Sequence, residues 1–471
     1  MKPRVRFAPS PTGELHLGGV RTALTNFLFT KKHQGTFLIR IEDTDHERSR
    51  KEYIDQICDS LQWLGLQWDE EISFQSDRGL AYEYCIDQLI NTGHAYRCFC
   101  SKEELELIRK ETGSFLYNGI WRGREQSEIN NEIKKGTPFT IRLATPDDGV
   151  TEFEDMVYGK ISISNTELDD FIIARSDGSP VYNFTNVVDD KNMNISHVIR
   201  GEDHISNTPK QILIYEALGY DVPNFAHLPM ILGDDKKRLS KRHGATGVHY
   251  YRDSGYQPNA LINYLALLGW NPGTEKEIFN LDKLIEEFDL SKVQKKSAIF
   301  DHKKFHWVSS QHLILQDNKD VLSDLIDIDK QWSDDEKQKD YLKLINIMKH
   351  RSHSLKDLIE RSQFFFHRPM NFDEKNFKKV WVEGTNSIMQ DLKKNLEFID
   401  SWVSSELEIK FNEFINKKEL GYGKIMRPLR FALCGNLNGP SLFDIMELLG
   451  KKEFKYRLNY IINEFRNNEQ K

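Results

Sequence analysis

The sequence predicts a multidomain α/β protein in which a parallel-sheet domain is followed by an all-α module. Three observations support this prediction. The chain has 471 residues, whereas a single hydrophobic core stops growing at roughly 250–300 residues. Near the N-terminus, segments with strand and helix patterns alternate. From about residue 321 to the end, apolar residues follow helical spacing almost throughout.

The first elements form a βαβ unit. Residues 4–8 read as a short buried strand, which ends at Pro9 and the proline and glycine that follow. Apolar residues recur at helical spacing over residues 19–32, and residues 37–41 form a second apolar strand. A strand, a glycine-bearing turn, a helix and a strand in this order indicate a parallel sheet.

The middle of the chain combines helices with short strands. Helical patterns cover residues 51–64 and 79–92, and irregular strand and turn signals over about 95–185 indicate an insertion into the sheet domain. Further on we expect strands at 197–200 and 228–232 and a helix at 259–268.

Composition and charge exclude several classes of protein. The chain is 39% hydrophobic and 29% charged, and it has no run of about 18 apolar residues, so we expect no membrane span and no membrane partner. It has no apolar signal core, and its five cysteines are scattered, so we expect a cytoplasmic protein without disulfides. A net charge of -7 does not point to nucleic acid, so an RNA-binding chain of this kind must gather its basic residues on one face.

Two loops carry the chemical signals. Pro9-Ser-Pro-Thr-Gly-Glu-Leu-His-Leu-Gly-Gly19 joins the first strand to the first helix. Its glycines let a ligand approach the helix N-terminus, whose N–H groups favour phosphate, and His16 adds a donor. Lys236-Lys-Arg-Leu-Ser-Lys-Arg-His-Gly244 holds five lysines and arginines that can neutralise a triphosphate. Taken singly, the first loop could be a connecting turn, and the second a solvated basic loop or an RNA-backbone contact.

As a pair, the two loops resemble the signatures of class I aminoacyl-tRNA synthetases. Four segments are similar to the bacterial glutamyl-tRNA synthetases: Arg6-Phe-Ala-Pro-Ser-Pro-Thr-Gly13, Arg40-Ile-Glu-Asp-Thr-Asp45, Val198-Ile-Arg-Gly-Glu-Asp-His204 and Leu239-Ser-Lys-Arg-His-Gly244. Their order and spacing hold from the N-terminus to about Trp307, and the C-terminal module matches in length and helical character.

The resemblance implies a Rossmann-like parallel-sheet catalytic domain with an inserted α+β domain, followed by an all-α anticodon-binding module. The expected domains are the first half of the catalytic domain at 1–95, an inserted acceptor-end-binding domain at 96–186, the second half with the basic loop at 187–246, a stem-contact domain at 247–322 and the anticodon-binding domain at 323–471.

The implied reaction joins L-glutamate to tRNA(Glu) in two steps. Glutamate and ATP first form glutamyl-adenylate and pyrophosphate, and glutamate then moves to the 3'-terminal adenosine. Magnesium is expected to travel with ATP, members of the family generally need bound tRNA before activation, and the expected protein is a monomer. The residues implied to bind ATP, with His16 and Lys241 as the catalytic pair, are Pro9, Ser10, His16, Gly18, Gly19, Arg238, Leu239, Ser240, Lys241 and Arg242.

The implied glutamate site has to bind two carboxylates and an ammonium group. A guanidinium binds a carboxylate through two parallel hydrogen bonds, which suits Arg6 and Arg200, and Glu42 can accept from the ammonium group. The resemblance assigns Arg6 to the substrate side chain. It also adds Ala8, Ser10 and Tyr182 to the site. The alternatives are a surface ion pair for Arg6 and a pair with Arg40 or Arg48 for Glu42.

One part of the family pattern is missing. Cys98-Phe-Cys100 matches the start of a zinc site found in many relatives, which supply two more ligands in a segment of the form Tyr-Asp-Gly-x-Cys-x-His. Here that segment is Tyr117-Asn-Gly-Ile-Trp121-Arg-Gly123. A structural zinc takes four ligands and only Cys98 and Cys100 remain, so we predict no protein-bound zinc, with Trp121 filling the space.

The resemblance also implies a tRNA-binding surface. The candidates are Lys292, Lys295, Lys296, Lys303 and Lys304 for backbone contacts, and Arg427 and Arg430 in the anticodon module. The alternative for the lysines is a solvated face.

Four other functions compete with this one. A truncated relative that glutamylates a tRNA base lacks the anticodon module, whereas this chain has one. A glutaminyl-tRNA synthetase would not need the same arginine and usually ends in β-barrels, whereas this chain ends in helices. A non-catalytic tRNA-binding relative predicts damage at His16, Glu42 or Lys241, and none is damaged. A general nucleotidyltransferase leaves the C-terminal module unexplained. Charging of tRNA(Gln) with glutamate stays open, because it depends on a few anticodon contacts.

Overall fold

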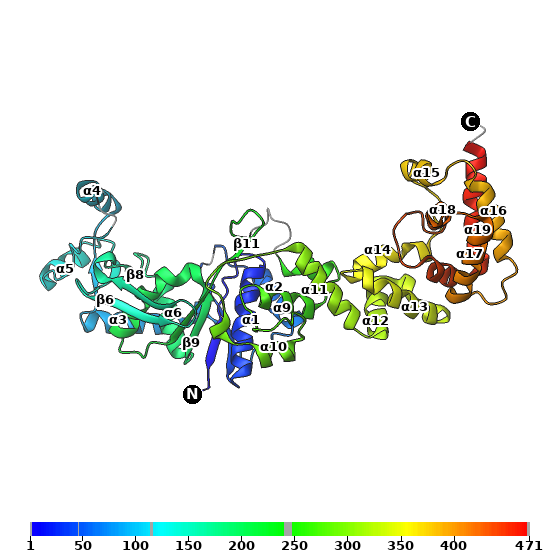
Figure 1. The fold of residues 1–471 in the computed structure, drawn as a ribbon. Helices are drawn as coiled ribbons and strands as arrows, with labels where there is room; N and C mark the ends of the chain where they lie inside the picture. The colour runs from blue at the N-terminus through cyan, green and yellow to red at the C-terminus, as the bar shows by residue number, and fades with distance from the viewer. Residues whose placement is uncertain (1, 46, 114–115, 240–246, 469–471) are drawn as a thin grey trace. The chain divides into compact units, whose positions relative to one another are not determined.

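The computed structural model describes residues 2–45, 47–113, 116–239 and 247–468 (Figure 1). It divides into two compact units, Met1–Tyr251 with Pro258–Phe305, and Arg252–Gln257 with His306–Lys471. Within the described ranges, no helix is long and apolar enough to cross a membrane.

The first unit contains the predicted βαβ unit. β1 (Arg4–Phe7) and β2 (Thr36–Ile41) pair in parallel, with Val5 opposite Phe37, and α1 (Leu17–Lys32) connects them. β3 (Ser73–Phe74) extends the sheet in the order β1-β2-β3. The parallel sheet predicted from the N-terminal pattern is therefore confirmed.

A second group of strands lies beyond β1 in the order β7-β6-β10-β9. These strands are β6 (Val150–Asp155), β7 (Gly159–Ser164), β9 (His197–Gly201) and β10 (Asn224–Leu228). β10 runs parallel to both β9 and β6. The backbone N–H of Ser196 donates to the carbonyl oxygen of Arg4 at 2.9 Å, which joins the start of β9 to β1. Part of the range 96–186 thus pairs with the strands of the catalytic sheet.

The strand expected at 228–232 is split into two pieces. β10 ends at Leu228, and β11 (Ile231–Leu232) pairs instead with β12 (Ala298–Ile299). Proline has no N–H to donate, so Pro229 cannot continue the ladder, and the N–H of Met230 donates to Glu202 Oε1 at 2.7 Å.

Helices pack beside the strands of this unit. α9 (Pro258–Leu267) and α10 (Leu281–Glu287) pack beside α1 (Figure 1). An apolar cluster joins α3, α6 and α7 to the antiparallel sheet β4-β5-β8. The bounds of these elements are α3 (Gly79–Asn91), α6 (Tyr182–Asn192), α7 (Thr208–Ala217), β4 (Ala95–Cys98), β5 (Thr140–Leu143) and β8 (Ile172–Ala174). The remaining helices of this part are α2 (Lys51–Trp63), α4 (Lys102–Thr112), α5 (Gln126–Lys134) and α8 (Val248–Asp253).

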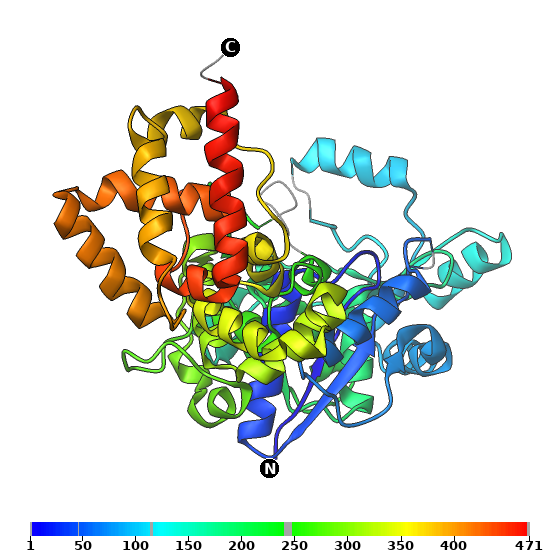
Figure 2. The ribbon, with the colours of Figure 1, turned by 90° about the vertical axis from the view of Figure 1, so that its right-hand side faces the viewer.

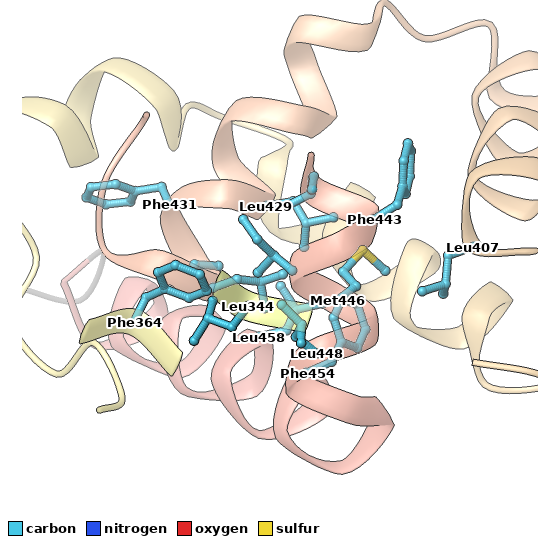
Figure 3. Packing of buried hydrophobic residues seen from close by; sticks show 14 of the residues in the cluster. Leu344, Phe364, Leu407, Leu429, Phe431, Phe443, Met446, Leu448, Phe454 and Leu458 are labelled. Carbon is cyan, nitrogen blue, oxygen red and sulfur yellow. The ribbon is translucent and has the colours of Figure 1, made fainter. Parts of the chain in front are cut away.

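The second unit is helical, as predicted. α11 (His302–Leu315) leads into α12 (Asn318–Ile328), α13 (Gln338–Met348), α14 (Leu355–Phe366), α15 (Glu374–Val380), α16 (Thr385–Leu396), α17 (Ser404–Lys418), α18 (Tyr422–Cys434) and α19 (Leu442–Asn468). Figure 2 shows α19 in red beside the orange α16 and α17. Gly450 divides α19 into two helical segments, because its φ of 75° is not helical. Glycine adopts such a positive φ without strain. Buried side chains such as Leu344, Met446 and Phe454 fill the core of this unit (Figure 3).

Candidate active site

The carboxyl ends of β1 and β2 meet one face of α6 in a buried polar cluster. Arg6 donates from Nε to Asp190 Oδ1 at 2.9 Å and from Nη2 to Asp190 Oδ2 at 3.2 Å. Arg40 donates to the same Asp190 at 2.5 Å and to Asn186 Oδ1 at 2.9 Å. Ligands of open parallel sheets bind at these strand ends. The alternative of a surface ion pair for Arg6 is wrong, because its partner is buried.

Glu42 follows β2 directly and joins the cluster. Its Oε1 accepts from Asn186 Nδ2 at 2.9 Å and from Arg40 Nη2 at 3.3 Å. The pair with Arg40 weighed from the sequence is therefore present, whereas Arg48 pairs with Asp45 at 2.6 Å. Burial raises the pKa of Glu42, and the charges of Arg40 and Arg6 work against that rise.

The cluster holds its charges firmly. Burial acts to lower the pKa of Arg40, but the carboxylates of Asp190, Glu42 and Asp189 outweigh it and raise that pKa, so Arg40 stays charged. Burial acts to raise the pKa of Asp190, but Arg6 and Arg40 bring it below its ordinary value. Arg6, Arg40, Glu42 and Asp190 thus form a buried charged cluster at the strand ends.

Arg200 enters from β9 with neutral partners. Its Nε donates to His227 Nε2 at 3.1 Å, and its Nη2 donates to Thr208 Oγ1 at 2.8 Å. Its Nη1 is buried without a hydrogen-bond partner in the described part of the chain. Burial lowers the pKa of Arg200.

Tyr182 opens α6 beside these groups. Its hydroxyl lies 3.1 Å from His204 Nδ1. Desolvation and the charge of Glu42 raise the pKa of Tyr182 to about 12, so the hydroxyl stays neutral. The charges of Arg200 and Arg6 act in the opposite direction on this pKa. The Pro9 carbonyl accepts from the Glu42 N–H at 3.0 Å, and the neighbouring Ala8 is half-buried and Ser10 exposed.

His16 caps the first helix. Its Nδ1 accepts from the backbone N–H of Gly19 at 3.1 Å, so the neutral ring carries its proton on Nε2 and can donate it. Desolvation and the charge of Arg238 lower the pKa of His16. A Cβ on Gly18 would lie 3.1 Å from the imidazole, so glycine there leaves room for the ring. The amide of Gly19, expected to face a phosphate, is used by His16 in this structure.

The described residues of the basic loop lie near β11, and Gly247, just after the loop, lies near His16. The Leu239 N–H donates to the Ile231 carbonyl at 3.0 Å. Arg238 lies 3.5 Å from Asp203, and Gly247 forms an antiparallel bridge with His16. Three of the expected ATP-binding residues, Ser240, Lys241 and Arg242, lie outside the described residues, and their roles stay predictions.

Comparison with known proteins identifies the family. Residues 2–307 match the model of the class I tRNA synthetases (E and Q), catalytic domain, and residues 307–462 match that of an anticodon binding domain. The chain belongs to the class I tRNA synthetases of the E and Q group. The predicted family and fold class are thereby confirmed.

Relatives resemble this synthetase over its whole length. A glutamate–tRNA ligase of Geotalea uraniireducens is 43% identical over 460 residues, which cover 97% of each chain. One of Syntrophotalea carbinolica is 44% identical over 463 residues, 97% of this chain and 98% of its own. A crystal structure of a glutamate tRNA ligase from Elizabethkingia meningosepticum in complex with its amino acid superposes with a TM-score of 0.89 at 38% identity, and covers 98% of this chain and 99% of that one.

Cys98 and Cys100 of this synthetase lie close to the hydroxyl of Tyr117. The Tyr117 hydroxyl accepts from Cys98 Sγ at 3.4 Å and from the Trp121 N–H at 3.0 Å, and lies 3.9 Å from Cys100 Sγ. The Trp121 ring packs on Phe99 with centroids 4.8 Å apart. Burial raises the pKa of Cys100 to about 11. Among the residues that the structure describes, no group of three or more histidine, cysteine or acidic side chains is placed for a metal. This donor set does not fit the zinc of the relatives.

Most of the expected tRNA-contacting lysines already have partners. Lys292 donates to the Pro272 carbonyl and Lys295 to the Tyr158 carbonyl, each at 2.9 Å, and Lys304 pairs with Glu277. Lys296 and Lys303 are exposed. In the second unit, Arg427 is exposed, and Arg430 is half-buried with an Nη1 that has no partner there. Burial lowers the pKa of Arg430. The tRNA roles of these residues stay predictions.

Sequence reasoning missed four buried polar residues of the site. Asn186 and Asp190 were visible as a signal, because Tyr182, Asn186 and Asp190 recur every four residues and so share one helix face. His227 gave no such signal, since it lies among apolar residues of β10, and neither did Asp155, which is one of three acidic residues in β6.

Proposed function

We propose that the chain is a glutamate–tRNA ligase, which activates L-glutamate with ATP and transfers it to the 3'-terminal adenosine of tRNA(Glu). The observation that supports this most is the buried cluster at the strand ends, which brings Arg6 and Glu42 together with Arg40. Arg6 and Arg200 suit the two carboxylates of glutamate. Glu42, with Tyr182 beside it, suits the ammonium group.

In the activation step, an oxygen of the glutamate α-carboxylate attacks the α-phosphorus of ATP. A P–O bond to glutamate forms, the P–O bond to pyrophosphate breaks, and glutamyl-adenylate results. We assign positioning and charge stabilisation to the chain's residues. His16 donates from Nε2 to a phosphate oxygen, and Arg238 and Lys241 neutralise the departing pyrophosphate. Magnesium accompanies ATP as part of that substrate.

In the transfer step, a hydroxyl oxygen of the terminal ribose attacks the glutamyl carbonyl carbon. The ester bond forms, the bond between the carbonyl carbon and the phosphate oxygen breaks, and the hydroxyl proton goes to the phosphate of the departing AMP. We assign acceptor-end binding to residues 96–186, stem contacts to the lysines between 292 and 304, and anticodon recognition to the second unit with Arg427 and Arg430. We further propose a monomer that works in the cytoplasm.

The test is pyrophosphate exchange with glutamate or glutamine, with and without tRNA. We expect exchange with glutamate in the presence of tRNA(Glu) and little with glutamine. If the wild-type protein shows no exchange with glutamate in the presence of any tRNA, the proposal is refuted. Charging of purified tRNA(Glu) and tRNA(Gln) then tells whether both are substrates.

A further inference from the structure

A buried chain of three side chains links three neighbouring strands to the glutamate site. Asp155 Oδ2 lies 2.7 Å from His227 Nδ1, and His227 Nε2 accepts from Arg200 Nε at 3.1 Å. Asp155 is on β6, His227 on β10 and Arg200 on β9, with His227 directly opposite Arg200 in the register. Their exposed fractions are 1%, 0% and 5%.

The protons in this chain can be assigned from its donors. An arginine Nε always donates, so His227 Nε2 must be an acceptor. The ring is then neutral and carries its proton on Nδ1, which donates to Asp155. The other oxygen of Asp155 accepts from the N–H groups of Val157 at 2.9 Å and Tyr158 at 2.8 Å. The carboxylate is therefore anchored to the backbone, and it fixes the tautomer and orientation of the imidazole.

A histidine at this place orients an arginine without cancelling its charge. Arg6 is held by the carboxylate of Asp190. In contrast, the side-chain hydrogen bonds of Arg200 go to neutral acceptors, His227 at Nε and Thr208 at Nη2, and Asp190 acts on Arg200 only through its charge. Nη1 is left buried without a partner. A fixed guanidinium with an unfilled buried donor is suited to bind a carboxylate.

We propose that Asp155 and His227, with Thr208, are positioning residues that hold Arg200 for a carboxylate of the amino-acid substrate. This inference rests on the proposed function. It also assigns a role in amino-acid recognition to a strand of the range 96–186, which we expected to serve the acceptor end alone.

The test compares substitutions at His227 in aminoacylation with saturating tRNA(Glu). His227→Leu removes the acceptor for Arg200, and we expect the KM for glutamate to rise about 10-fold or more, since hydrogen bonds to charged groups carry effects of that size. The KM for ATP should stay within about twofold. His227→Gln keeps an acceptor oxygen and should recover most of the glutamate affinity.

A matched control is His197→Leu, at the opposite end of the same strand pair, where Asn224 faces His197. It should leave the glutamate KM unchanged. Should His227→Leu not fold, Thr208→Val removes only the hydroxyl that holds Nη2, and the glutamate KM must still rise severalfold. A wild-type glutamate KM in a folded His227→Leu or Thr208→Val protein, or an equal rise in both KM values, overturns the inference and leaves the proposed function standing. Wild-type protein that activates no glutamate overturns both.

Discussion

Replacing Asp190 by asparagine tests whether the buried charged cluster of Arg6, Arg40, Glu42 and Asp190 stabilises the folded protein. Both carboxylate oxygens are used, Oδ1 by Arg6 and Arg40 and Oδ2 by Arg6. An asparagine keeps one acceptor oxygen but turns an NH2 group toward an arginine donor. Removing one partner of a buried ion pair costs about 3–5 kcal/mol, and the remaining oxygen puts the expected loss near the lower end, at about 3 kcal/mol.

The assay is thermal unfolding followed by calorimetry, which can separate the transitions of the two units. A domain of moderate size shifts its Tm by about 2–4 °C per kcal/mol, so about 6–12 °C is the upper range for this larger unit. Asp87→Asn, an exposed position on α3, is the control and should change stability by less than about 0.5 kcal/mol. If Asp190→Asn melts within about 2 °C of this control, the two arginines do not depend on Asp190 and the reasoning fails.

The pH dependence of the same variant gives a second check. The pKa of Asp190 is lower in the folded protein than the ordinary value of 3.8. A depressed carboxyl pKa stabilises the fold above the unfolded value, and this stabilisation is lost as the pH falls through the folded value. The difference between wild type and Asp190→Asn should therefore be full at neutral pH and shrink only below about pH 4.

Three further predictions concern the loops. His16→Ala should lower kcat by roughly 100-fold or more with little change in the glutamate KM, because it removes a phosphate donor, and unchanged kcat contradicts that role. Desolvation and the charge of Arg238 lower the pKa of His16 from 6.5. The KM for ATP should therefore stay flat from pH 8 to about 6.5 and rise below the lowered pKa, because protonation of the imidazole removes the acceptor for the Gly19 N–H. A rise that is complete above pH 7 argues against this role of His16. Tyr117→Phe leaves the Trp121 N–H without its acceptor and should cost about 1–3 kcal/mol, while metal analysis of the wild type should find no zinc; one zinc per chain would refute the phenol-centred arrangement.

The sequence was sufficient for the local parts of the site and insufficient for its long-range contacts. Arg6 and Glu42 were named from the motifs that carry the resemblance, and their glutamate roles stay predictions. The contact between Asp190 and Arg6 could not be predicted, since it spans 184 residues and depends on how α6 packs against the sheet. His227 lies one residue before the strand that we expected at 228–232, and its partner Asp155 lay in a range that we expected to form another domain. Periodicity reports which face of an element is buried, but it does not tell which buried polar groups will meet.

The two arginines assigned to the substrate differ in electrostatics although their chemistry is the same. Arg6 shares Asp190 with Arg40, so its charge is largely balanced before any ligand arrives. Arg200 instead donates to His227 and Thr208, and burial lowers its pKa, so its charge is less fully balanced in the empty site. A substrate carboxylate would balance that charge. The KM for glutamate should therefore depend more on Arg200 than on Arg6, because binding the substrate removes a cost that is already present in the empty site.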